Sequence, residues 1–291
     1  FGTDNSVDAG YMAWQQPLAL GTANAVYVED STFTRGASTI SGEDAIDAYT
    51  GARLVIRHNQ FTNAHHGFHG TDSGSQRSPV SFEIYNNVYT NNSGTNSVGG
   101  GRMRGGTGVL FNNTWNGTNT WTDFVLVLYR ACGTNFSTWQ KCDGTVWELG
   151  SDVLSSSLSR TCSTTGNFRL DTATNEILGP EGGSYTKAFD GVGTGGYPCR
   201  DQPGMGPGQV SVPIYWWSNT GISIGTWNLG DPGNCNGLGI DNYILSGRDY
   251  INNGTTPKPG YTAYTYPHPL QAGSGGSSLG GGIRLSGGVR F

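Results

Sequence analysis

Between about residues 20 and 120, apolar and polar positions recur with a period of 26–28 residues. Four segments align without gaps, and each has an aliphatic residue, a polar residue three positions later and an aromatic residue five positions later. The aliphatic column is Val28, Ile56, Ile84 and Leu110, the polar column is Ser31, Asn59, Asn87 and Asn113, and the aromatic column is Phe33, Phe61, Tyr89 and Trp115. No such repeat can bury its apolar side chains alone, so the period predicts stacked repeats of short strands. We expect the apolar columns in the core and the Asn residues in one turn, with their amides bonded to one another and their backbone left-handed.

Three of the repeats share the pattern aliphatic, any residue, Asn or His, Asn, any residue, aromatic, in residues 56–63, 84–91 and 110–116. This pattern resembles that of the pectate-lyase-like family of right-handed parallel β-helix proteins. The resemblance implies an all-β fold, a right-handed parallel β-helix (β-solenoid) with long loop insertions. It carries no catalytic residue across, because that family includes lyases, hydrolases, phage tailspikes and adhesins.

The second half of the chain is less regular. Residues 124–129 form a continuous apolar run that predicts a buried strand, and residues 222–227 and 239–245 resemble further repeats. Residues 130–210 are expected to be loops inserted on one face of the helix. Residues 256–270 are rich in Pro and Tyr, so we expect them to lie along the helix or cap it and not to form a central strand.

The C-terminal residues are expected to form a separate tail. Residues 1–270 make up the β-helix domain, and residues 271–291 are a Gly/Ser-rich linker followed by a strand. Apolar residues alternate with Arg, Ser or Gly in that strand, which is typical of a half-buried strand, and they are Ile283, Leu285, Val289 and Phe291. The unpaired edge at a β-helix end accepts strands, so we expect burial on a neighbouring subunit. The alternative is that the tail folds back onto its own chain.

Composition favours an exported β-protein. The chain has 48 Gly and only 13% charged residues, which disfavours a helical protein, and its net charge of -5 gives no basic field for nucleic acid. No stretch approaches 18 consecutive apolar residues, so no membrane span is expected. An extracellular or cell-surface location would allow disulfides between Cys132 and Cys142 and between Cys162 and Cys199, leaving Cys235 unpaired. The sequence does not fix this connectivity.

Two polar clusters are candidates for chemistry. The first follows the second repeat and contains His69, Asp72, Arg77 and Glu83, of which the carboxylates could act as acids or metal ligands and Arg77 could hold a sugar carboxylate. The second is Glu43, Asp44 and Asp47, one repeat earlier, where stacked carboxylates could hold Ca²⁺. The alternative is a polar loop whose side chains cap turns. No other cofactor is expected.

Two functions therefore remain in view. The first is an extracellular structural protein that self-assembles, as a filament or surface-layer subunit, through its C-terminal strand. The second is a β-helix enzyme or binding protein that acts on a polysaccharide as a lyase or hydrolase. Whether the chain is an enzyme stays open, because no acid/base pair or metal constellation stands out, and the first function is favoured.

Overall fold

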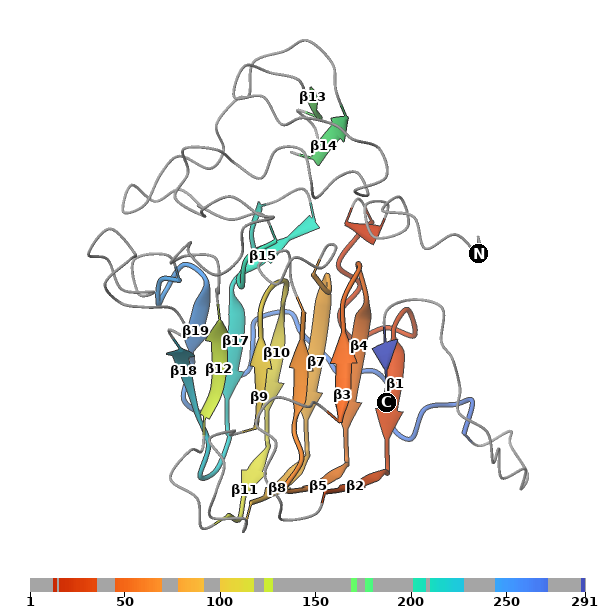
Figure 1. Ribbon diagram of the computed structural model, residues 1–291, viewed down its shortest axis with the longest axis vertical. Helices are drawn as coiled ribbons and strands as arrows, with labels where there is room; N and C mark the ends of the chain where they lie inside the picture. Colours follow the sequence, from red (N-terminus) through yellow and green to blue (C-terminus); the bar gives the residue numbers. More distant parts are fainter. Residues whose placement is uncertain are drawn as a thin grey trace.

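The computed structural model describes residues 13–14, 16–35, 45–69, 78–91, 100–117, 123–127, 169–171, 176–179, 201–207, 210–227, 244–271 and 289–290. In these residues the protein is all-β, with scarcely any helix, and its long sheets are parallel and stacked (Figure 1). All five Cys residues lie outside the described residues, so the predicted disulfides stay predictions.

Three parallel sheets form the body of the molecule. Sheet A has the order β1 (Val26–Glu29), β4 (Arg53–Arg57), β7 (Ser81–Tyr85), β10 (Thr107–Phe111), β17 (Ile214–Trp217) and β19 (Tyr250–Asn252). Sheet B has the order β2 (Thr32–Thr34), β5 (Gln60–Thr62), β8 (Val88–Thr90) and β11 (Thr114–Trp115). Sheet C has the order β3 (Ile46–Ala48), β6 (His66–Phe68), β9 (Gly101–Met103), β12 (Asp123–Val127) and β18 (Ser223–Trp227), with β20 (Val289–Arg290) antiparallel to β3.

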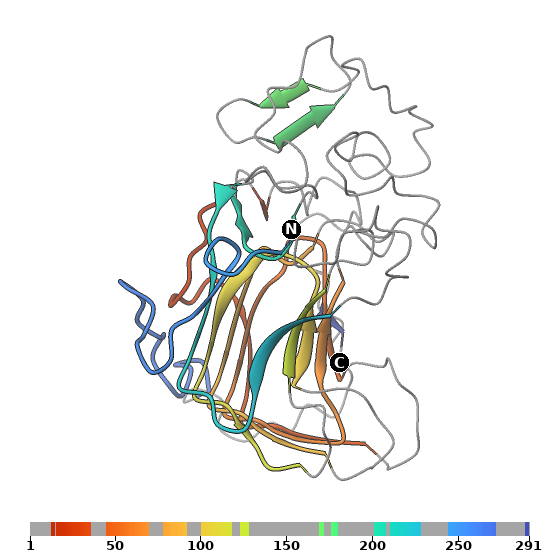
Figure 2. The same cartoon turned by 90° about the vertical axis from the view of Figure 1, so that its left-hand side faces the viewer.

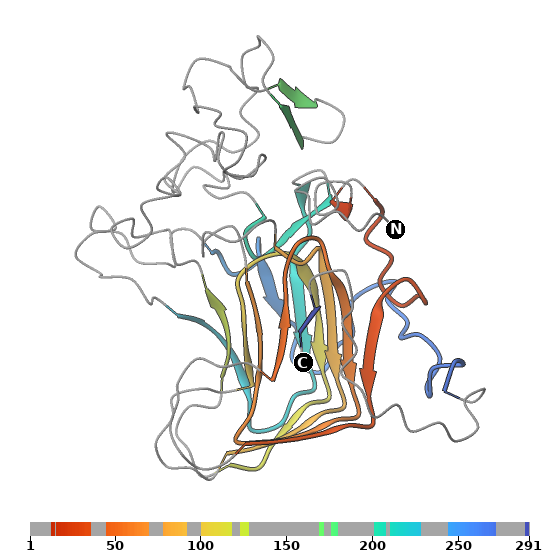
Figure 3. The same cartoon turned by 45° about the vertical axis from the view of Figure 1, so that its right-hand side comes forward.

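The chain visits these sheets in a fixed order. From β1 to β12 it passes four times from sheet A to sheet B to sheet C, so each sequence repeat supplies one strand to every sheet. Seen along the stack, sheet B crosses below sheets A and C (Figure 2), and an oblique view shows its strands side by side (Figure 3). The set β1, β2 and β3 is called the first repeat below, and it forms one end of the stack.

The interior columns follow the sequence period. Val28 pairs with Ile56, Ile56 with Ile84 and Ile84 with Leu110, and all four side chains are buried in one core cluster. In sheet B the rings of Phe33, Phe61 and Tyr89 stack with centroids 4.9 Å apart, and the register continues to Trp115. The predicted aliphatic and aromatic columns are therefore confirmed.

The polar column forms a hydrogen-bonded ladder. Asn87 Oδ1 accepts hydrogen bonds from the backbone N–H and the Nδ2 of Asn59, at 3.0 and 3.1 Å, and Asn87 Nδ2 donates to the carbonyl of Ile56. The same oxygen-to-N–H link runs from Ser31 through Asn113 to Asn219. Each carboxamide reaches back to the preceding repeat. Ser31 lies in the first repeat, where the described sheets contain no preceding repeat for a carboxamide to bond.

One detail of this turn differs from expectation. The left-handed residue is not the ladder Asn but the residue before it. This column has φ of 52–57° and consists of Asp30, His58, Asn86, Asn112 and Ser218. Asn, Asp and His tolerate this conformation better than most residues. Two adjacent columns thus have different roles. The residues of the first turn the backbone, and those of the second form hydrogen bonds between repeats.

Other elements match the sequence in part. The run at 124–129 contains β12, whose Phe124 and Leu126 are buried, and residues 222–227 contain β18, parallel to it. The expected repeat at 239–245 lies mostly outside the described residues. The insertion expected to be loops also contains strands, which pair antiparallel as β13 (Arg169–Asp171) with β14 (Glu176–Gly179) and β15 (Met205–Gly206) with β16 (Val210–Ser211).

Candidate functional site

The outer face of sheet C carries a group of polar side chains. Along β6, the rings of His66 and Phe68 lie 5.6 Å apart in the core, so the alternation of a strand turns His65, Gly67 and His69 to the outside. The register places Asp47 of β3 on one side of Gly67 and Arg102 of β9 on the other. Four polar side chains thus surround one glycine.

These side chains form two pairs. His69 Nδ1 lies 2.8 Å from Asp47 Oδ1, and both side chains are partly accessible, with 34% and 19% of their surface exposed. Arg102 Nη2 lies 3.3 Å from His65 Nε2. A guanidinium only donates, so His65 Nε2 is the acceptor and the imidazole is neutral with its proton on Nδ1. Because Gly67 has no side chain, nothing from β6 fills the space between Asp47 and Arg102.

The arrangement offers two kinds of chemistry. A carboxylate bonded to one nitrogen of an imidazole orients the ring, as in general acid/base catalysis. An arginine two strands away provides a fork of donors for a carboxylate or another anion. Within the described ranges no group of three or more His, Cys, Asp or Glu side chains could hold a metal ion.

The structure combines the two predicted clusters only in part. It brings His69 of the first cluster to Asp47 of the second, a contact between residues 22 positions apart. It does not bring Glu83 to His69, because Glu83 lies in β7 on the outer face of sheet A, 2% exposed. Asp72, Arg77, Glu43 and Asp44 lie outside the described residues, so their predicted roles as acids or Ca²⁺ ligands stay predictions.

The edge of sheet C next to this site is occupied by the tail. β20 pairs antiparallel with β3, with Val289 opposite Ala48 and Arg290 opposite Asp47. The strand that receives the tail here belongs to the same chain, which is the fold-back arrangement left open by the sequence. Ile283, Leu285 and Phe291 lie outside the described residues, and their burial on a neighbouring subunit stays a prediction.

The outer face of sheet A is covered by residues 256–271, called the strap below. No strand forms there, and the strap crosses the face as predicted from its Pro and Tyr content (Figure 2). Its main anchor is Arg57 of β4, which is fully buried, pairs with Glu29 at 2.6 Å and donates to the carbonyls of Tyr264 and Thr265. In the sequence Arg57 is marked only as one of two arginines, with Arg53, that flank a run of three apolar residues.

Glu83 anchors the strap a second time. Its carboxylate accepts hydrogen bonds from the hydroxyl of Tyr261 at 2.5 Å and from the backbone N–H of Gly21 at 2.8 Å. Burial raises the pKa of this carboxyl above its ordinary value, against the opposing effect of the two hydrogen bonds. Glu83 therefore holds two covering segments in place, and its contacts differ from those of a substrate-facing acid.

No protein-family model, curated protein or solved structure matches the chain. In the part of the chain that the structure describes, no helix is long and apolar enough to cross a membrane.

Proposed function

We propose that this protein is an extracellular structural protein that self-associates, built on a right-handed parallel β-helix, in which the C-terminal strand of one copy adds to the first repeat of another. The observation that carries the proposal is the pairing of β20 with β3. β3 is otherwise the edge strand of sheet C, and a free edge is a template for strand addition.

The length of the tail allows an exchange between copies. Seventeen residues lie between Gln271 and Val289, and an extended chain spans about 3.3–3.6 Å per residue. The strand can therefore reach β3 of its own chain or of an adjacent one. Exchange of an identical element is a low-cost route to oligomers, and repetition around a non-closing contact would give a filament.

Two further observations support the proposed architecture and location. The chain passes repeatedly from sheet A through sheets B and C to the next parallel strand of sheet A, and connections between parallel strands are almost always right-handed. Low charge, abundant Gly and five Cys are typical of an exported β-protein.

Removal of the tail tests this proposal. The chain lacking residues 273–291 should stay folded and soluble but lose the assembly that depends on strand exchange, so that no species larger than a dimer remains, as measured by light scattering on a sizing column. A matched variant that lacks only residues 273–282 keeps the strand on a shorter tether, and should assemble more strongly, because a short hinge favours exchange over fold-back. Unfolding of the first variant would instead make the tail an internal cap, and unchanged assembly would show that it plays no part.

The outer face of sheet C favours a second candidate function, binding or cleavage of an acidic polysaccharide. Arg102 could hold a sugar carboxylate and the Asp47–His69 pair could move a proton, with the saccharide lying over Gly67. Incubation with a uronic-acid polymer should then release products, unsaturated ones in the case of a lyase. His69→Gln should abolish their release and His268→Gln, on the strap, should not. Equal product release by the two variants would exclude this site.

A further inference from the structure

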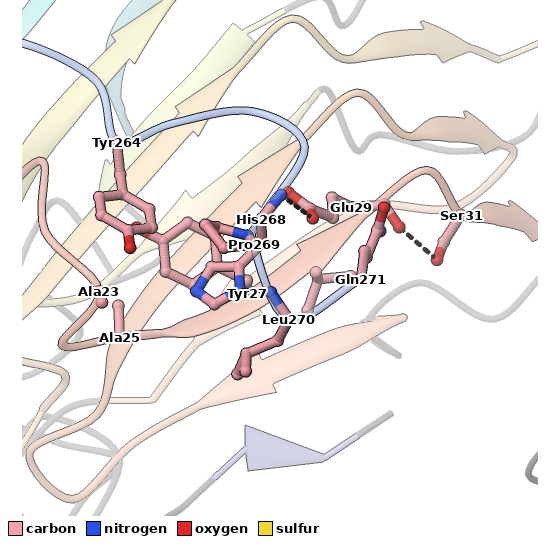
Figure 4. A pocket seen from close by; sticks show the side chains of 11 residues that line it. Ala23, Ala25, Tyr27, Glu29, Ser31, Tyr264, His268, Pro269, Leu270 and Gln271 are labelled. Carbon is pink, nitrogen blue, oxygen red and sulfur yellow. Dashed lines mark hydrogen bonds between the residues drawn. The ribbon is translucent and has the colours of Figure 1, made fainter. Parts of the chain in front are cut away.

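A groove runs along the edge strand of sheet A, at the same end of the molecule as β3. Its volume is about 760 Å³, and it lies between β1 and the end of the strap. Figure 4 shows the rings of Tyr27, Tyr264 and His268 together on its wall, with centroids 4.6–5.8 Å apart, and Leu270 and Gln271 beside the strand. The groove is therefore bounded by an edge strand on one side and by a short, mostly apolar segment on the other.

The backbone groups of β1 that face the groove can be assigned by alternation. Val28 carbonyl accepts a hydrogen bond from Asn59 Nδ2, so Val28 faces the second repeat. The N–H and C=O groups of Tyr27 and Glu29 then point the other way, toward the free edge. The Glu29 carbonyl accepts a bond from Ser31 Oγ at 3.1 Å, and within the described residues no element pairs with β1 on this side. To an added strand the edge offers two N–H donors and, as acceptors, the Tyr27 carbonyl and the second lone pair of the Glu29 carbonyl.

One large exposed apolar side chain, that of Leu270, lines the groove. Among the described residues, three large hydrophobic side chains stand out in solvent: Val210, Tyr266 and Leu270. Two of them, Tyr266 and Leu270, lie on the strap next to β1, and Leu270 is 79% exposed. An exposed apolar patch beside a free strand edge is typical of an interaction surface.

The opposite edge of sheet A does not complement this one. At β19 the carbonyl of Tyr250 already accepts a hydrogen bond from the Gly247 N–H at 2.8 Å, which covers part of that edge. Copies stacked head to tail, with the β19 edge of one against the β1 edge of the next, would therefore form fewer backbone hydrogen bonds. The β1 edge complements itself instead, because residues 27 and 29 are two positions apart, and in an antiparallel pair centred on Val28 each Tyr27 lies opposite a Glu29.

We propose that the β1 edge binds the β1 edge of a second copy, antiparallel and around a two-fold axis, with Leu270 of each copy buried in the groove. This deepens the proposed self-association, on which it rests, by naming the surface and the partner. β1 and β3 belong to the same first repeat, so the edge pairing and the strand exchange meet at one end of the molecule. A closed two-fold contact of this kind joins pairs of copies.

A charge at the rim tests the edge pairing. Leu270→Glu should weaken dimerisation roughly tenfold or more, because burial of two leucines is replaced by two like charges near the axis. Val210→Glu is the matched control, since Val210 is also exposed, at 50%, but lies in β16 away from the groove. Mass measured by light scattering across a dilution series gives the dissociation constants.

Hydrogen exchange adds a readout specific to β1. The amides of Tyr27 and Glu29 should be protected at high protein concentration and exchange quickly on dilution, whether or not residues 273–291 are present. Protection that does not change with concentration, or that follows only the addition of an oligosaccharide to a monomer, would overturn the edge pairing. If copies still exchange their C-terminal strands but the β1 amides show no concentration-dependent protection, this inference alone would be overturned. A monomer at all concentrations would overturn both proposals.

Discussion

The outer faces of sheets A and C belong to the same stack of repeats, but the first is covered by the strap and the second is partly exposed. On sheet A, the row Glu29, Arg57, Tyr85, Phe111 and Trp217 has an ion pair at one end and, from Tyr85 on, stacked rings 4.4–4.5 Å apart. The strap covers this row. On sheet C, the row Asp47, Gly67, Arg102 is polar. Asp47 and the neighbouring His69 stay partly exposed, whereas Arg102 is buried.

This difference indicates that the outer face of sheet A stabilises the fold and that the outer face of sheet C takes part in association or binding. The strap buries a guanidinium and a carboxylate, which is tolerated because every charged group there has a partner of the same chain. The sheet C face leaves Asp47 and His69 partly accessible and ends at the edge that accepts β20. Changes on sheet A should therefore act on folding, and changes on sheet C on association or ligand binding. The predictions below test this division.

Loss of the buried guanidinium should have the largest effect. Arg57→Ala leaves Glu29 buried without its partner and removes two bonds to the strap, so we expect a loss of about 3–5 kcal/mol in the free energy of unfolding. Arg53→Ala, on the same strand but half-buried, should cost much less. Urea unfolding of both variants measures this, and equal losses would contradict the role of Arg57 as the anchor.

The Asn ladder should contribute less per residue. Asn87→Ala leaves buried amide groups of the turn unpaired and should cost about 1–3 kcal/mol. Asn86→Gly is the matched control, because its left-handed backbone suits glycine and its position lies outside the ladder. Thermal unfolding distinguishes the two, and a larger loss for Asn86→Gly would contradict the division of the turn into two columns.

Glu83 should make the stability of the protein fall as pH rises above the ordinary range of a glutamate. Burial raises the pKa of Glu83 in the folded protein above its unfolded value, so its contribution is fully present below the unfolded pKa and is lost as pH rises through the folded pKa. Glu83→Gln should therefore gain stability relative to the wild type as pH rises above the ordinary range of a glutamate. Unfolding measured at several pH values tests this, and a constant difference would show that Glu83 is ionised in both states alike.

His58 should have the smallest effect, with the opposite sign. Its ring stacks on Tyr266 of the strap at 3.6 Å, and burial lowers the pKa of His58 in the folded protein. Stability is thus present above the unfolded pKa and is lost as pH falls through the folded pKa. His58→Asn, which places the residue of the next two repeats at this turn, should reduce the loss in acid. Equal acid sensitivity of both proteins would assign the loss to other groups.

The interior could be predicted from the sequence because its columns meet the same environment in every repeat. Val28, Ile56 and Ile84 each pack between like residues, so they vary little. The outer faces meet different partners at each level, and Arg57 has no counterpart in its column. The Asp47–His69 contact joins positions outside the aligned segments, so no period marks it. The left-handed column did leave a signal, in Asp30, His58, Asn86 and Asn112, one position before the ladder.

Exchange of charge between two variants tests whether copies exchange their C-terminal strands. The register puts Arg290 opposite Asp47, and like charges at opposite positions destabilise an antiparallel pair. Asp47→Arg and Arg290→Asp each create like charges within one chain. Both are made together with Leu270→Glu, which weakens the β1 edge pairing, so each variant alone should be a monomer by native mass spectrometry. Mixed together, each tail meets its complement only on the other chain, and the account predicts a one-to-one heterodimer. A mixture that remains monomeric, with the wild type assembling, would contradict strand exchange between copies.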